Sequence, residues 1–298
     1  MLGALLPVDV QPDDPQVQVG TVSLSAAVEG IDLDNVGFYV PPYMGPRSTL
    51  ALIERLPRLQ VVQLLTAGFE SALPYLPPGV VLCNARGVHD ASTSELAVAL
   101  TLASLRGIDD FARAMPEGAW LSGRREALAD KRVVVIGAGG VGTGIRQRLE
   151  PFETDVVLVG RTARDGVVGI DDLSAVLPLA DIVILAVPHT PETTRLVDRS
   201  FLSLLRDGCL LVNVARGGVV DTEALLMEVG AGRLRAALDV TDPEPLPSEH
   251  PLWRLPNVLI SPHVGGNSSA FLPRARRLVR EQLARWRGNE PVRHVVSG

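Results

Sequence analysis

The chain has 298 residues, of which 46% are hydrophobic, and its formal net charge is -6. This length suits one large domain or two ordinary domains with a substantial core. The mildly acidic balance argues against nucleic acid as the main partner, because phosphate binding needs a concentrated basic surface. No apolar run approaches the roughly 18 residues that span a bilayer, so we expect no membrane segment.

The two cysteines, Cys83 and Cys209, lie in apolar runs and have no metal-binding or redox spacing. We expect both to be buried structural thiols, which favours a reducing compartment and a cytoplasmic protein, and we expect no metal site. The apolar start of the chain lacks a basic region and reaches acidic residues quickly, so it does not resemble a signal peptide.

The first hundred residues alternate between strand and helix patterns. Apolar or β-branched runs at 37–41, 59–65 and 79–85 predict strands, and the spacing of apolar positions over 48–56 predicts a helix. Such alternation favours a parallel sheet flanked by helices. Residues 41–44 (Pro-Pro-Tyr-Met) either approach a substrate pocket or form a turn at a strand end.

A polar cap at 92–95 leads into a long apolar helix that Pro116 and Gly118 end. A second series begins with the strand at 133–136, and its further strands are mostly apolar throughout, as in parallel strands buried on both faces. These strands are expected at 155–160, 180–188, 208–214, 235–240 and 257–262, followed by an amphipathic basic helix at 271–288 with a solvated face. The pattern predicts two α/β domains: a cofactor domain over 99–267, and a substrate domain over 1–98 that residues 268–298 complete.

The sharpest local signal is Gly137-Ala138-Gly139-Gly140-Val141-Gly142, which follows a strand and precedes a helix with periodic apolar positions. The first glycine permits a tight turn, the second lets the backbone approach a pyrophosphate, and the last allows close helix packing. The N–H groups at the helix start then face the negative charge. Glycine-rich turns also occur without a ligand, but the strand–loop–helix setting favours dinucleotide binding here.

The end of the next strand indicates which dinucleotide binds. An NAD enzyme usually carries an acidic residue about 20 residues after the loop, where it binds the ribose hydroxyls. Here Gly160 is followed by Arg161, Thr162 and Arg164, and the first acid is Asp165. Because guanidinium groups suit a 2′-phosphate, we predict a preference for NADP(H), with NAD(H) possible. Alternatively, these are solvated loop charges and NAD is accepted equally.

Three later segments each end an apolar strand with a polar group: Arg216 follows 208–214, Glu244 follows 235–240, and His263 follows 257–262. Ligands of open α/β sheets gather beyond the carboxyl ends of the strands, so these three side chains are expected in one cleft. Carbonyl reduction needs a cation for the substrate carboxylate, an acid for the forming alkoxide, and a group that keeps this acid protonated. Arginine, histidine and a carboxylate fill these roles.

The sequence resembles the D-isomer-specific 2-hydroxyacid dehydrogenases, the family of glyoxylate/hydroxypyruvate reductases and phosphoglycerate dehydrogenases. The matching segments run from about Gln60 to Gly266 and include NARGVHDASTSELAVAL, VVVIGAGGVG, LLVNVARGGVVDTEAL and NVLISPHVGG. The resemblance implies an α/β fold of two Rossmann-like domains, in which a doubly wound parallel-sheet cofactor domain is inserted in a smaller, flavodoxin-like substrate domain. It also implies a homodimer whose cleft closes to exclude water.

The resemblance implies roles for single residues. Arg216 would bind substrate, Glu244 would support the histidine, and His263 would donate and accept the proton. The backbone N–H groups of Ala67 and Gly68 would hold the substrate carboxylate. Further cofactor contacts are implied for Thr93, Pro188, Val214, Ala215, Asp239 and Gly265, with Asp239 at the nicotinamide carboxamide.

Some residues differ from the family's usual pattern, and two other functions stay open as alternatives. Thr241 replaces a common aromatic residue and Glu70 a usual aspartate, whereas the acid at Glu244 argues against a formate dehydrogenase, which has an amide there. The expected reaction is reduction of a small 2-keto acid such as glyoxylate or hydroxypyruvate with NADPH. The alternatives are a dinucleotide-sensing protein without catalysis and an enzyme acting on phosphite or another small anion.

Overall fold

The computed structural model describes residues 2–11 and 17–297. The chain divides into two compact units, and each is described by itself. Unit 1 comprises Met1–His89 and Ser269–Gly298, and unit 2 comprises Asp90–Ser268, so the second is inserted into the first along the sequence. Within the described residues, each unit contains a seven-stranded sheet that is largely parallel. The expected α/β class with two parallel-sheet domains is therefore confirmed.

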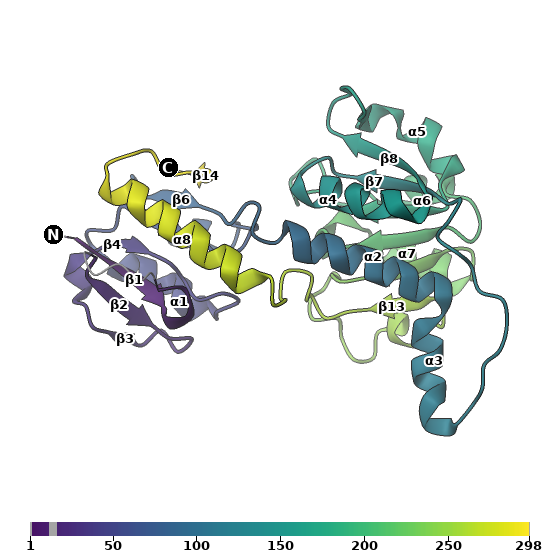
Figure 1. The fold of residues 1–298 in the computed structure, drawn as a ribbon, viewed down its shortest axis with the longest axis horizontal. Helices are drawn as coiled ribbons and strands as arrows, with labels where there is room; N and C mark the ends of the chain where they lie inside the picture. Colours follow the sequence, from purple (N-terminus) through teal and green to yellow (C-terminus); the bar gives the residue numbers. More distant parts are fainter. Residues whose placement is uncertain (1, 12–16, 298) are drawn as a thin grey trace. The chain divides into compact units, whose positions relative to one another are not determined.

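The sheet of unit 1 has the order β14-β6-β5-β4-β1-β2-β3, with β3 and β14 antiparallel at its edges. Three of its strands lie before residue 37, ahead of the first strand expected from the sequence. Helix α8 (Phe271–Arg287) covers one face, and α1 (Arg47–Ala51) with the following 3₁₀ turn covers the other (Figure 1). The strands are β1 Gly3–Pro7, β2 Val19–Val22, β3 Val28–Glu29, β4 Val36–Tyr39, β5 Val61–Gln63, β6 Val81–Cys83 and β14 Val295–Ser297.

The sheet of unit 2 has the order β13-β12-β11-β10-β7-β8-β9, and all of its neighbouring strands are parallel. The strand order reverses between β7 and β10, which is the topological switch point of a doubly wound fold. The strands are β7 Arg132–Ile136, β8 Asp155–Gly160, β9 Val168–Gly169, β10 Ile182–Leu185, β11 Leu210–Asn213, β12 Arg235–Leu238 and β13 Val258–Ile260. The helices are α2 Asp90–Arg106, α3 Ile108–Ala114, α4 Gly140–Leu149, α5 Leu173–Val176, α6 Arg199–Leu204 and α7 Thr222–Gly230.

The apolar runs of unit 2 form strands because both faces of its sheet are covered. In β7, Val133 and Val135 pack with α2 and α4, whereas Val134 and Ile136 belong to the core on the other face with α6 and α7. Continuous hydrophobicity is what such a doubly covered strand needs. This explains why the runs without period-2 alternation predict the strands of unit 2.

Helix α2 belongs to unit 2, and the domain boundary expected at residues 98 and 99 falls inside it. Its buried Ala97, Val98 and Leu105 lie in the same core as residues of α4. The helix starts at Asp90, two residues before the expected polar cap. Ser92 therefore lies inside the helix, and its hydroxyl hydrogen-bonds the hydroxyl of Ser268 at 2.6 Å.

The two cysteines are buried and free, as expected for structural thiols. Burial raises the pKa of the Cys83 thiol to about 11 and that of the Cys209 thiol to about 12. Both therefore stay protonated and unreactive near neutral pH. Among residues 2–11 and 17–297, none of the helices combines the length and apolar content that a membrane crossing requires.

Candidate active site

The glycine loop joins β7 to α4, as the sequence predicts. Gly137 has φ +120°, and a Cβ there would lie 2.4 Å from the carbonyl oxygen of Ala186. A Cβ on Gly142 would lie 1.7 Å from the carbonyl oxygen of Gly137, so the helix packs directly on the turn. By contrast, a Cβ on Gly139 would meet nothing within 4 Å. The backbone at Gly139 is thus bare and accessible, which is what the approach of a pyrophosphate needs.

The start of α4 fits a dinucleotide as well. Its first residues are Gly140 and Val141, and the helix runs ten residues to Leu149. Unpaired N–H groups at such a helix start favour a negative group. A Cβ on Gly140 would lie 1.8 Å from a carboxylate oxygen of Asp90, so a side chain there would require the Asp90 side chain to move. The loop therefore has the shape that the predicted cofactor requires.

The segment after β8 carries the predicted 2′-phosphate residues. Arg161, Thr162 and Arg164 are all exposed. Arg164 and Val167 exchange two backbone hydrogen bonds of 3.0 and 2.9 Å, which form a tight turn. The guanidinium Nη2 of Arg164 donates to the carbonyl oxygen of Ala138 at 3.2 Å, so this side chain reaches back to the glycine loop. Two guanidinium groups thus lie in the segment where an NAD enzyme usually carries an acid.

Arg216 follows β11 in a turn that a buried asparagine builds. The side-chain oxygen of Asn213 accepts from the N–H of Ala215 at 3.0 Å, and its amide donates to the carbonyl oxygen of Arg216 at 3.1 Å. The guanidinium Nη1 of Arg216 donates to the carbonyl oxygen of Ala215 at 2.7 Å. The side chain is half-buried, so donors of the planar guanidinium remain available to a ligand.

His263 and Glu244 form an ion pair between Nδ1 of the ring and Oε1 of the carboxylate. The two side chains are 32% and 40% exposed, and the other ring nitrogen of His263 has no hydrogen-bond partner in the part of the chain that the structure describes. His263 has φ +52°, a left-handed conformation that is uncommon for residues other than glycine. A carboxylate on one ring nitrogen fixes the orientation of the ring.

Asp239 holds the loop that carries His263. It is 3% exposed, and its Oδ1 accepts from the hydroxyl of Ser261 at 2.6 Å and from the N–H of Val264 at 2.9 Å. Its Oδ2 accepts from the N–H of Gly265 at 2.8 Å. The resemblance implies for Asp239 only a contact with the nicotinamide carboxamide, and that contact stays a prediction. Its structural role is recognisable only once the strand ends are known to be neighbours.

The strand register places the segments that carry Arg216, Glu244 and His263 at the carboxyl end of the same sheet. Asn213 of β11 pairs with Leu238 of β12, and Leu238 pairs with Ile260 of β13. Arg216 and His263 each follow their strand by three residues, and the Glu244 segment leaves the strand between them. The predicted convergence of these side chains beyond the carboxyl ends of the strands agrees with this topology.

The remaining residues predicted to contact the cofactor lie beyond strand ends or beside the loop that carries His263. Thr93 lies within 3.5 Å of the position a Cβ on Gly265 would take. Val214 and Ala215 are buried at the end of β11, whereas Pro188 is exposed and its carbonyl oxygen accepts from the hydroxyl of Thr193 at 2.7 Å. Their contacts with a cofactor stay predictions.

Ala67 and Gly68 belong to unit 1 and form a loop after β5. The amide of Asn84 donates to the carbonyl oxygen of Ala67 at 2.8 Å, and the hydroxyl of Thr66 donates to that of Gly68 at 2.7 Å. Both carbonyl groups are thus engaged, while the N–H groups of Ala67 and Gly68 find no partner among the described residues. This is the arrangement that a carboxylate-binding loop needs, and Asn84 supports it without having been singled out by the sequence.

The residues 41–44 form a turn after β4, and Tyr43 packs on other aromatic rings of unit 1. Its ring centroid lies 5.5 Å from that of His89 and 4.1 Å from that of Phe271. The Nε2 of His89 hydrogen-bonds the carbonyl oxygen of Leu65 at 2.8 Å. Tyr43 and His89 thus have packing partners of their own within unit 1.

The comparisons with known proteins agree with this geometry. The model of the NAD binding domain of D-isomer specific 2-hydroxyacid dehydrogenases matches residues 98–265. A D-3-phosphoglycerate dehydrogenase of Archaeoglobus fulgidus is 33% identical over 74% of this chain and 43% of its own length. A glyoxylate reductase of Thermofilum pendens is 30% identical over 80% of this chain and 76% of its own. The chain thus spans less than half of the first of these relatives.

Solved structures share both units of the fold. A D-isomer specific 2-hydroxyacid dehydrogenase of Xanthobacter autotrophicus Py2, in complex with NADPH and MES, is 29% identical with a TM-score of 0.81. The match covers 99% of this chain and 98% of that one. The similarity therefore extends beyond the cofactor domain to nearly every residue.

Proposed function

The chain belongs to the D-isomer specific 2-hydroxyacid dehydrogenase family, and on this premise we propose that it reduces a small 2-keto acid to the D-2-hydroxy acid, reversibly. The substrate class is that of glyoxylate and hydroxypyruvate. The observation that carries the proposal is the ion pair of His263 with Glu244. It lies beyond the carboxyl ends of the same strands as Arg216, in a unit whose glycine loop suits a dinucleotide.

Each of the three side chains has one task in this proposal. Arg216 binds the substrate carboxylate and polarises the keto group through its guanidinium. His263 gives a proton to the forming alkoxide oxygen, and Glu244 keeps the ring oriented for that step. The bound nicotinamide dinucleotide supplies the hydride. In the reverse direction His263 takes the proton from the hydroxyl group.

A panel assay tests the reaction class. Oxidation of NADPH and of NADH is followed with glyoxylate, hydroxypyruvate and phenylpyruvate, and glyoxylate or hydroxypyruvate is expected to give the highest kcat/KM. The relative called a glyoxylate reductase supports this order, and the relative called a phosphoglycerate dehydrogenase makes a larger hydroxy acid the next choice. Dinucleotide binding without turnover of any keto acid would favour a dinucleotide-sensing protein. Turnover of phosphite alone would favour an enzyme that acts on phosphite or another small anion.

The cofactor is proposed to be NADP(H) in preference to NAD(H). Changing Arg161 to Asp is expected to lower kcat/KM with NADPH by about tenfold or more, because a carboxylate repels the 2′-phosphate and suits the ribose hydroxyls. The ratio of kcat/KM for NADPH to that for NADH measures the effect. The matched control is Arg254→Asp, which makes the same charge change beside β13, at the opposite edge of the same sheet.

An unchanged cofactor ratio in Arg161→Asp would contradict this assignment. The preference has support from the exposed guanidinium groups after β8 and from the bound NADPH of the Xanthobacter relative. An equal shift of the NADPH-to-NADH ratio in Arg254→Asp would also contradict the assignment. The cofactor preference would then depend on the net charge of the protein and not on the position of Arg161.

The working assembly is proposed to be a homodimer formed through α3 and the segment after it. Apolar side chains are exposed there, above all Trp120 at 93% and Met115 at 76%, and α3 projects from the body of unit 2 (Figure 1). Exposed clusters of this kind mark interaction surfaces. Light scattering on the parent chain is expected to give twice the mass of one chain, and Trp120→Glu is expected to give monomers. A parent that is monomeric at tens of micromolar would contradict the dimer.

The location is proposed to be the cytoplasm. Support comes from Cys83 and Cys209, which are both buried and free, as in proteins of reducing compartments. The partners proposed are the keto acid and its hydroxy acid, and not nucleic acid, because the net charge is -6.

A further inference from the structure

The loop that carries Arg216 and the loop that carries Glu244 touch through their backbones. A Cβ on Gly217 would lie 1.9 Å from the carbonyl oxygen of Thr241 and 2.8 Å from the nitrogen of Asp242. This approach is possible only because Gly217 has no side chain. The two loops are therefore in direct backbone contact at Gly217, with no side chain between them.

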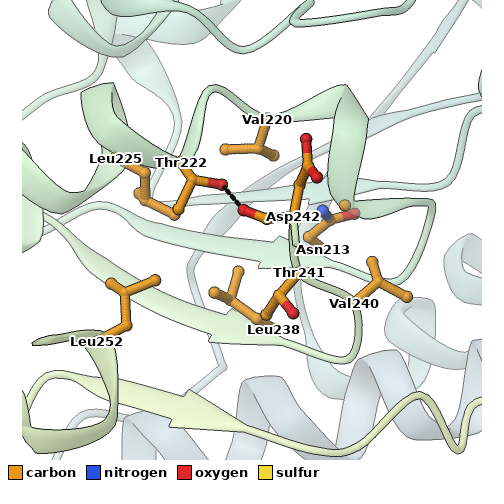
Figure 2. Close-up of a pocket in the computed structure, with 10 residues that line it drawn as sticks. Asn213, Val220, Thr222, Leu225, Leu238, Val240, Thr241, Asp242 and Leu252 are labelled. Carbon is orange, nitrogen blue, oxygen red and sulfur yellow. Dashed lines mark hydrogen bonds between the residues drawn. The ribbon is translucent and has the colours of Figure 1, made fainter. Parts of the chain in front are cut away.

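A single threonine fastens the Glu244 loop to a rigid element. Thr222 is the first residue of α7, and its hydroxyl donates to the carbonyl oxygen of Asp242 at 2.7 Å (Figure 2). The helix start is itself fixed, because the side chain of Asp221 accepts from the N–H of Ala224 at 3.0 Å. Buried Leu225 anchors α7 in the core of unit 2. Thr222 thus connects the loop to a well-packed helix.

The Glu244 loop has little other support. Residues 242–245 are exposed, and the hydroxyl of Thr241 bonds the carbonyl oxygen of Pro243 within the same loop. Among the described residues, 242–245 make hydrogen bonds outside their own loop only to Thr222 and His263. The cavity between the loops in Figure 2 has a volume of about 10 Å³, enough for at most one water, so no reactant occupies it.

We propose that Thr222 is a positioning residue that holds the carboxylate of Glu244 against His263, an inference that rests on the proposed function. Without the Thr222 hydroxyl, the carbonyl of Asp242 loses its partner and the exposed loop relaxes. The carboxylate then no longer stands in line with Nδ1 of the ring. The step that suffers is proton transfer at His263, whereas the binding of the keto-acid carboxylate at Arg216 persists.

Steady-state kinetics of three variants test the proposal first. Thr222→Val is expected to lower kcat on the order of tenfold, because small misplacements of reacting groups are costly, with KM for the keto acid changed by less than about threefold. Thr222→Ser keeps the hydroxyl and is expected to restore most of kcat. The matched control is Thr154→Val, since the Thr154 hydroxyl also donates to a backbone carbonyl, that of Leu149 at 2.9 Å, at the opposite end of the sheet.

A double-mutant cycle with Glu244→Gln separates positioning from a general loss of structure. Because Thr222 acts through Glu244, adding Thr222→Val to Glu244→Gln is expected to lower kcat by less than about twofold more. A full tenfold further loss, or a kcat in Thr222→Val equal to that of the parent, would overturn the proposal. If Glu244→Gln itself left kcat unchanged, the assigned role of Glu244 would fall, and with it this inference.

Discussion

Replacing His263 by alanine is expected to lower kcat for keto-acid reduction by about 10² to 10⁴-fold, because the alkoxide loses its positioned proton donor. Dinucleotide affinity is expected to stay within a few-fold of the parent value, since the glycine loop proposed to bind it lies between β7 and α4. Stopped-flow measurement of NADPH oxidation gives the first quantity, and fluorescence titration of NADPH gives the second.

The matched control is His250→Ala. Within residues 2–11 and 17–297, the His250 ring has one hydrogen bond, which its Nδ1 accepts from the N–H of Leu252 at 3.3 Å, at the start of a 3₁₀ turn (Pro251–Arg254) ahead of β13. This variant should turn over like the parent. Near-normal turnover in His263→Ala, or an equal loss in both histidine variants, would contradict the role of the imidazole.

The second large effect is expected from Arg216→Lys. Lysine keeps the positive charge but loses the planar pair of donors, so kcat/KM for the keto acid should fall by about 10²-fold. The backbone turn at Asn213 does not depend on the guanidinium, because its hydrogen bonds go to backbone groups of Ala215 and Arg216. Steady-state kinetics with glyoxylate measures kcat/KM for the keto acid, and titration with NADPH measures the affinity for the cofactor.

Arg254→Lys serves as the control for this substitution, because Arg254 is an exposed residue ahead of β13. A value of kcat/KM in Arg216→Lys within a few-fold of the parent would mean that the guanidinium fork does not hold the substrate. A loss confined to NADPH affinity would instead assign Arg216 to the cofactor.

The cofactor domain could be predicted from the sequence because its strands are buried on both faces. The run 155–160 forms β8 with the expected ends, and the run 208–214 contains β11 (Leu210–Asn213). The expected strand at 180–188 is shorter in the structure, ending at Leu185, because the apolar run continues into the loop that carries Pro188. Apolar continuity therefore locates a strand better than it fixes its end.

The substrate domain was harder to predict because its elements are short. Strand β1 has five residues, all buried, between β2 and β4, yet its apolar stretch alone resembles any brief hydrophobic run. Strand β14 near the end of the chain pairs with β6, more than two hundred residues earlier in the sequence. Only tertiary pairing makes these segments strands, and a single sequence carries no record of it.

The candidate site also has a part that the sequence predicts and a part that only the structure reveals. Arg216, Glu244 and His263 could be named because their residue types suit the chemistry and each follows an apolar strand. The supporting roles of Asp239, Thr222 and Asn84 could not be predicted, because these side chains act through hydrogen bonds to backbone groups 17 to 26 residues away. Such contacts depend on which strand ends are neighbours, and that is a property of the fold.

A crystal structure with NADPH and oxamate, an unreactive analogue of a 2-keto acid, tests the central claim most directly. The oxamate carboxylate is expected on the guanidinium of Arg216, with Nε2 of His263 within about 3 Å of the oxamate amide carbonyl oxygen and Glu244 on the other ring nitrogen. Oxamate bound beside the nicotinamide with either Arg216 or His263 turned away from it would contradict the account.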